Sequence, residues 1–125
     1  MPLVISNLSL LILLALFAGS LRAAEPATGD ARIEALISRV EVMKDVKFIR
    51  NGTAYDPGNA AKFLRGKWQA RKKEIRKPAE FIEKVATRSS TTGKPYLIRS
   101  KDGSEKPCGP YLTEELKQIE AGSPP

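Results

Sequence analysis

The chain has 125 residues and a net charge of +7, with no histidine and a single cysteine, Cys108. These counts exclude an intramolecular disulfide, the Ser/His and Cys/His nucleophile pairs, and the zinc sites that depend on histidine. We therefore expect no metal site and no cofactor.

A strongly apolar run, Leu8–Gly19, precedes small residues and then a polar chain. The run is shorter than the roughly 20 residues that cross a bilayer and is typical of a secretory signal peptide. We expect cleavage after Ser20 or after Ala23 or Ala24 and a periplasmic or secreted product, with an uncleaved membrane anchor as the alternative. Residues 1–24 are then signal peptide, 25–29 a flexible segment, 30–120 one domain and 121–125 a disordered tail.

The first element predicted after this leader is an amphipathic helix that begins with Asp30 as its N-cap. Its apolar residues recur at helical spacing and form one stripe, which consists of Ile33, Leu36, Ile37, Val40 and Met43. Such a stripe is typical of a helix that packs against a core.

Residues 46–55 predict a β-hairpin, because Asn51-Gly52 is the dipeptide that best accepts the positive φ angles of a type I′ turn. This turn sets Arg50 opposite Thr53 and Ile49 opposite Ala54. Phe48 and Tyr55 are then a cross-strand aromatic pair.

Three further helices and a strand complete the predicted order. Asp56 and Pro57 start a helix that extends to Arg76 and buries Ala60, Ala61, Leu64, Trp68 and Ile75. Pro78 starts a helix that buries Phe81, Ile82, Val85 and Ala86, residues 95–99 form a strand, and Thr113 caps a last short helix that carries Leu116 and Ile119. The fold class is α+β, a three-stranded antiparallel sheet packed against three to four helices.

Positive charge is concentrated in residues 62–77, which we call the basic segment. It contains eight of the 21 basic residues and one acid, Glu74. On the predicted helix Arg65, Lys72 and Arg76 form one row without acids one turn away, which indicates an anion-binding surface. Phospholipid headgroups, lipopolysaccharide phosphates or an acidic protein fit an exported chain better than nucleic acid, for which the aromatic residues are too few.

The hydroxyl-rich stretch RSSTTGKPYLIR, residues 88–99, raises the question of a phosphate loop or a nucleophile. It lacks the glycine and the Ser/Thr that a phosphate loop needs at its ends, and it leads from a helix into a strand. A serine nucleophile at Ser89 or Ser90 needs Lys94 or a carboxylate as its base, with Glu80, Glu83 and Asp56 as the candidates. Turn chemistry explains the stretch with fewer requirements.

Three sequence blocks carry a family resemblance: FIRNGTAY (Phe48–Tyr55), AAKFLRGK (Ala60–Lys67) and PAEFIEKVATRSSTTGKPYLIR (Pro78–Arg99). With the first helix and the signal peptide, they resemble the YfeK-like family of small exported bacterial proteins, whose function is uncharacterised. The resemblance spans nearly the whole chain. It implies an exported single domain and supplies no activity.

Two hypotheses follow. The first is a non-catalytic binding module that faces an anionic envelope component or an acidic protein. The second is a small enzyme that uses the Ser89–Lys94 loop, and docking through a sheet edge is a further alternative. Cys108 is expected as a packed loop residue, with a Cys108-linked dimer less favoured. The candidate binding residues are Arg50, Arg65, Lys67, Lys72, Arg76, Ser89, Ser90 and Lys94.

Overall fold

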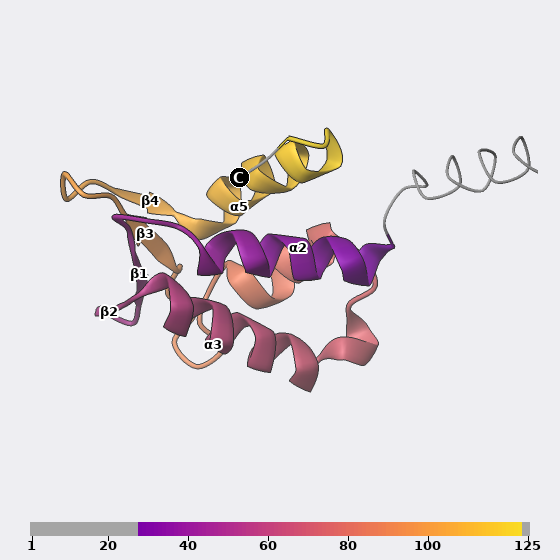
Figure 1. Ribbon diagram of the computed structural model, residues 1–125. Coiled ribbons are helices and arrows are strands. Elements are labelled where there is room, and N and C mark those ends of the chain that lie inside the picture. Colours follow the sequence, from indigo (N-terminus) through magenta and orange to yellow (C-terminus); the bar gives the residue numbers. More distant parts are fainter. Residues whose placement is uncertain (1–27, 124–125) are drawn as a thin grey trace, which may run out of the picture.

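The computed structural model describes residues 28–123 and has the α+β fold predicted (Figure 1). In chain order the elements are α2 (Gly29–Glu41), β1 (Lys47–Arg50), β2 (Thr53–Tyr55), α3 (Pro57–Ala70), the 3₁₀ turn η1 (Lys72–Glu74), α4 (Pro78–Phe81), the π-helical turn η2 (Ile82–Ala86), β3 (Leu97–Arg99), β4 (Glu105–Pro107) and α5 (Cys108–Glu120). The predicted signal peptide lies outside the described residues. Within them, no helix has the length and apolarity that a bilayer crossing needs.

The sheet has four antiparallel strands in the order β2-β1-β3-β4, one more than predicted. The hairpin register is confirmed, with Phe48 opposite Tyr55 and Arg50 opposite Thr53, and Asn51 and Gly52 have φ angles of 50° and 80°. The missed strand, β4, consists of three exposed residues, Glu105, Lys106 and Pro107, with no buried apolar side chain. An edge strand of this kind is formed by backbone pairing to β3 and leaves no hydrophobic pattern in the sequence.

The first helix begins two residues earlier than a cap at Asp30 requires. Thr28 is the N-cap, and its Oγ1 accepts a hydrogen bond from the Ala31 N–H at 3.2 Å. Asp30 lies in the first turn, where a negative charge interacts favourably with the helix dipole.

The helix that carries the basic segment is shorter than predicted. α3 ends at Ala70, a 3₁₀ turn follows, and Ile75 is buried from extended backbone (φ −120°, ψ 110°). The helix ends before Ile75, and the extended backbone that follows places the Ile75 side chain in the core. As a result Lys72 and Arg76 do not continue a helical row from Arg65.

The last helix is longer than predicted, because it begins at Cys108 and not at Thr113. Pro110 is tolerated there because the first turn of a helix has no intrahelical N–H bond to lose. Cys108 is therefore a buried helical residue and not part of a loop. Thr113 is inside the helix, where its hydroxyl donates to the Gly109 carbonyl at 2.9 Å.

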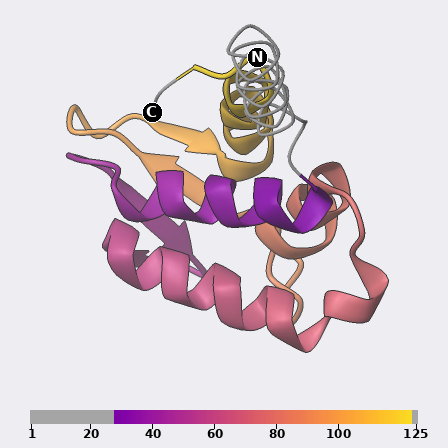
Figure 2. The ribbon, with the colours of Figure 1, turned by 45° about the vertical axis from the view of Figure 1, so that its right-hand side comes forward.

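The core lies where α2 passes between α3 and α5, with the sheet at one end of the three helices (Figures 1 and 2). The predicted stripe of α2 is fully buried except Met43, which packs at the border of the core. Trp68 of α3 meets Phe81 of α4 edge to face, with ring centroids 6.2 Å apart. This packing fixes α3, one wall of the pocket described below, against α4.

Candidate functional site

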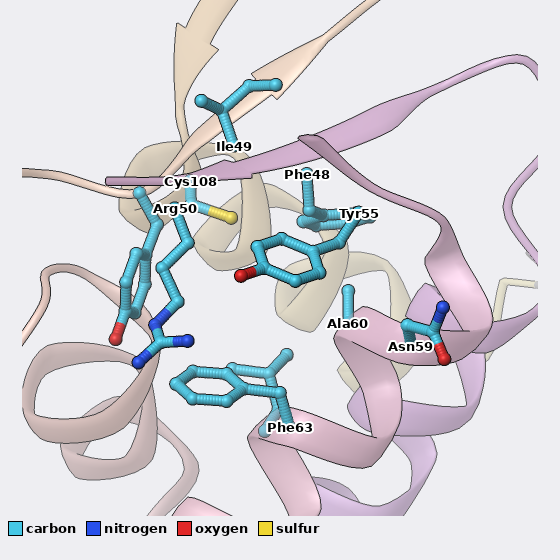
Figure 3. A pocket seen from close by; sticks show the side chains of 10 residues that line it. Phe48, Ile49, Arg50, Tyr55, Asn59, Ala60, Phe63 and Cys108 are labelled. Carbon is cyan, nitrogen blue, oxygen red and sulfur yellow. The ribbon is translucent and has the colours of Figure 1, made fainter. Parts of the chain in front are cut away.

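A pocket of about 290 Å³ lies between the hairpin and α3 (Figure 3). Phe48 and Arg50 reach it from the same face of β1, because residues two apart on a strand point the same way. From α3 it is lined by Ala60, Phe63 and Leu64, which share a helix face. Tyr55, Asn59, Ile49, Tyr96 and Cys108 complete the wall. Apart from Arg50, Asn59 and the tyrosine hydroxyls, the lining is apolar.

Arg50 is the charged residue of the pocket. Its guanidinium carbon lies 4.3 Å from the centroid of the Phe63 ring, which is a cation–π contact. Its Nε is buried and has no hydrogen-bond partner among residues 28–123. No carboxylate in that part of the chain pairs with it, although nine other ion pairs are present there. A half-buried guanidinium without a counter-ion is unusual, because desolvation of a charge is costly unless the charge is paired.

Lys67 supports the pocket from its outer side. Its Nζ donates to the Tyr96 hydroxyl at 3.0 Å and to the Arg88 carbonyl at 3.1 Å, and it lies 5.0 Å from the Tyr96 ring centroid. The Tyr96 and Phe63 rings meet edge to face at 5.9 Å. Lys67 therefore holds an aromatic wall in place, with two of its three N–H groups already donated.

The structure brings three of the eight predicted site residues into one region. Arg50 lines the pocket, Lys67 braces it, and Ser89 contacts Asn51, the residue after Arg50, through a hydrogen bond of 3.2 Å from Asn51 Nδ2. These three residues therefore lie at or beside the hairpin.

The other cations lie elsewhere. Arg65 pairs with Glu34 of α2 at 3.2 Å, and Lys72 lies 4.0 Å from Asp30 and 4.8 Å from the Trp68 ring centroid. Arg76 is exposed and follows the 3₁₀ turn. The basic segment lacks acidic partners on its own helix, and acids of α2 supply them instead.

The Ser89–Lys94 loop is a closed turn attached to the hairpin. Ser89 Oγ is buried and accepts from Asn51 Nδ2 and from the backbone N–H groups of Thr91 and Thr92 at 3.3 Å, and it shares a hydrogen with Thr91 Oγ1. The Thr92 hydroxyl donates back to Asn51 Oδ1 at 2.6 Å. The hydroxyls therefore fix the turn, whereas the side chains of Ser90 and Lys94 are exposed.

None of the three carboxylates proposed as a base hydrogen-bonds to Ser89 or Ser90. Asp56 pairs with Lys47, and Glu83 is exposed. Glu80 accepts from the backbone N–H groups of Arg76 and Lys77, and the hydrogen bond from Arg76 lowers the pKa of its carboxyl below the usual range. Within residues 28–123 no hydrogen bond joins the Lys94 side chain to either serine, so the loop gives the enzyme hypothesis no support. Residues 28–123 also contain no cluster of three metal-binding side chains.

Sequence reasoning missed Phe63, Tyr96 and Cys108 as pocket residues. Phe63 lies at the edge of the apolar stripe of its helix and is only partly buried, and a large aromatic residue in that position is the one signal that was present. Cys108 enters the pocket from α5, far along the chain. Burial raises the pKa of its thiol to about 12, so the side chain is a neutral, weakly polar part of the wall.

Comparison with known proteins places the chain in a family. Residues 27–120 match a family of unknown function, DUF5329, and the chain belongs to this family. A relative, the uncharacterized protein YfeK of Salmonella typhimurium (strain LT2), is 42% identical over 67 residues. The matched part is 54% of this chain and 56% of that protein, so the match spans little more than half of the relative. No solved structure matches the chain.

Proposed function

We propose that the protein is an exported, non-catalytic binding module that holds an anionic ligand in the pocket between the hairpin and α3. The observation that carries this proposal is the Arg50 guanidinium, which lines an apolar pocket without a counter-ion among residues 28–123. A concave, mostly apolar site with a few polar groups is the usual form of a small-molecule site. An anion seated there supplies the charge and the hydrogen-bond acceptor that Arg50 lacks.

The basic segment supports the same proposal at longer range. Lys62, Lys73, Arg76 and Lys77 form no ion pair within residues 28–123. Their field attracts anions and raises the rate of encounter, an effect that salt screens. An anionic envelope component or an acidic protein is the partner expected for this surface, consistent with the apolar leader and the proposed periplasmic or secreted location.

The proposal is tested with the full chain, recovered from the compartment into which a bacterial host delivers it. The isotope-labelled protein is titrated with the low-molecular-weight fraction of a bacterial envelope extract at low and at high salt, and backbone amide spectra are recorded. We expect chemical-shift changes at Phe48, Phe63 and Tyr96, which weaken as salt is added. The Arg50→Met variant abolishes them, whereas the matched variant Arg99→Met retains them, because Arg99 pairs with Glu105 outside the pocket. Absence of shifts, or equal shifts in both variants, overturns the proposal.

Charge reversal separates the contribution of the basic segment from that of the pocket. In the variant Lys62→Glu, Lys73→Glu, Arg76→Glu we expect slower association and a weaker salt dependence, with the same pocket residues perturbed. The control reverses Lys101 and Lys106, which lie at the β3–β4 turn and on β4, away from the segment. An unchanged association rate in the first variant shows that the basic segment does not steer the ligand.

A further inference from the structure

The contacts of Arg50 narrow the class of ligand. Resting on the proposed function, we infer that the pocket binds a small monocarboxylate with an apolar body. Its carboxylate lies against the in-plane edge of the Arg50 guanidinium, and its body lies among Phe48, Phe63 and Leu64.

The charge of the pocket sets the charge of the ligand. Arg50 is the one cation among the lining residues, and no carboxylate is present there to compete with a ligand. Lys67 is close, but two of its N–H groups are donated to Tyr96 and Arg88. One negative charge therefore neutralises the site, whereas a dianion leaves a buried excess charge that is costly.

The geometry of Arg50 favours a planar acceptor with two oxygens. The Phe63 ring lies against the guanidinium at 4.3 Å from its carbon, and a cation–π contact of this kind leaves the N–H groups in the guanidinium plane free to bond. The Nε atom is buried, so a carboxylate in the pocket accepts from the two terminal nitrogens of the guanidinium, a bidentate pair that keeps the ring contact. Figure 3 shows the Tyr55 hydroxyl directed toward the same space, where it can donate a further hydrogen bond.

The volume and lining set the size and polarity of the rest of the ligand. A pocket of about 290 Å³ lies at the lower end of small-molecule sites. It suits a body the size of one aromatic ring or a short alkyl chain, not a lipid or a nucleotide. Burial of apolar ligand surface against the aromatic and aliphatic walls makes the binding free energy more favourable. Acetate has almost no apolar surface and is therefore expected to bind weakly.

The test measures affinity calorimetrically for a panel of probes with the full chain. Phenylacetate and hexanoate are the positive probes, phenylacetamide removes the charge, acetate removes the body, and inorganic phosphate replaces the carboxylate. We expect phenylacetate to bind at least about tenfold more tightly than phenylacetamide, acetate or phosphate, since a charge-assisted bidentate pair and the buried ring each contribute at least that factor. Tighter binding of phosphate, or equal binding of acid and amide, overturns the inferred class.

Variants locate the carboxylate. Arg50→Lys keeps the charge and removes the planar fork, and we expect phenylacetate to bind at least about fivefold more weakly, with a larger loss in Arg50→Met. Arg99→Met makes the same change of net charge on β3 and should alter the affinity less than twofold. Thermal unfolding of each variant confirms that it folds, and equal losses in Arg50→Met and Arg99→Met overturn the assignment to Arg50.

The two proposals fail separately. If no probe binds but the envelope extract still perturbs Phe48, Phe63 and Tyr96, the ligand class is wrong and the binding module stands. If neither the probes nor the extract perturb these residues, both proposals are wrong.

Discussion

Arg39 of α2 and Arg50 of β1 both reach into the protein, and they differ in the partners that meet them. Arg39 of α2 is 7% exposed and donates to Glu115 at 3.0 Å, to Gln118 at 3.2 Å and to the Ser123 carbonyl. Arg50 has its Nε buried without a partner in the described chain and faces a pocket. The same side chain thus donates three hydrogen bonds in one place and has an Nε without a partner in the other.

The difference separates a residue that holds the fold from a residue that is available to a ligand. Arg39 joins α2 to α5 and to the turn after it, so its bonds exist only in the folded chain. Arg50 gains little from folding beyond the contact with Phe63, and a cost of this kind persists in proteins chiefly where function requires it. We therefore expect the two arginines to differ in their effect on stability as much as their surroundings do.

Replacement of Arg39 should have the largest effect on stability. Arg39→Met removes a buried cation and leaves Glu115, whose side chain is 18% exposed, without its partner. We expect the free energy of unfolding to fall by ~2–4 kcal/mol, measured by urea denaturation. Arg32→Met is the matched control on the same helix, because Arg32 pairs with Glu120 at the surface, and we expect a loss below about 1 kcal/mol. Equal losses in the two variants contradict the structural role of Arg39.

Two adjacent serines give a second contrast of the same kind, between a bonded and a free polar group. Ser89→Ala leaves Asn51 and the N–H groups of Thr91 and Thr92 without their shared acceptor, and we expect a loss of ~1–3 kcal/mol. Ser90→Ala changes an exposed side chain and should be neutral within about 0.5 kcal/mol. A larger effect of Ser90 on stability, or an activity lost specifically in Ser89→Ala at unchanged stability, contradicts the view of this loop as a structural turn.

Cys108, in the wall of the pocket, should make the free energy of unfolding depend on pH in the alkaline range. Burial raises the pKa of its thiol from 9.0 to about 12, so above pH 9 the unfolded chain loses this proton while the folded chain keeps it. The thiol's contribution is therefore complete below pH 9 and declines between about pH 9 and 12, by up to ~1.4 kcal/mol per pH unit. Urea denaturation at pH 8 and pH 10 should show a smaller decline in Cys108→Ala than in the wild type. Identical declines indicate that the thiol is exposed to solvent.

Replacement of Arg50 should have the smallest effect on stability. Arg50→Met keeps an apolar stem against Phe63 and removes a guanidinium with an unsatisfied Nε, so the two changes offset each other. We expect the free energy of unfolding to change by less than about 1 kcal/mol in urea denaturation. A loss as large as that of Arg39→Met shows instead that Arg50 holds the fold.

Residue spacing and backbone preference predicted correctly those helices and turns that depend only on neighbouring residues. The apolar stripe of α2 and the turn at Asn51-Gly52 both follow from spacing and backbone preference, and the hairpin register was confirmed. The end of α3 at Ala70 and the start of α5 at Cys108 were missed, because each depends on contacts with distant segments. β4 was missed because its residues carry no apolar pattern.

Only part of the candidate pocket could be predicted, because the rest depends on contacts between distant residues. Arg50 and Lys67 were chosen for their charge, but the partners that distinguish Arg50 from Arg39 are contributed by residues far away in the chain. Glu115 lies 76 positions from Arg39, and Tyr96 lies 29 positions from Lys67. The spacing of apolar or charged residues along the chain does not indicate which distant residues pair. The acids of α2 that meet Arg65 and Lys72 escaped the charge analysis of the basic segment for this reason as well.

The most direct test of the account compares the side-chain Nε–H signals of Arg50 and Arg39 by NMR while phenylacetate is added to the full chain. We expect the Arg50 signal to shift saturably and its hydrogen exchange to slow, since the carboxylate bonds to the terminal nitrogens of the same guanidinium, while the Arg39 signal stays unchanged. An Arg50 signal that does not move while phenylacetate binds, or equal shifts at both arginines, contradicts the distinction between the two residues.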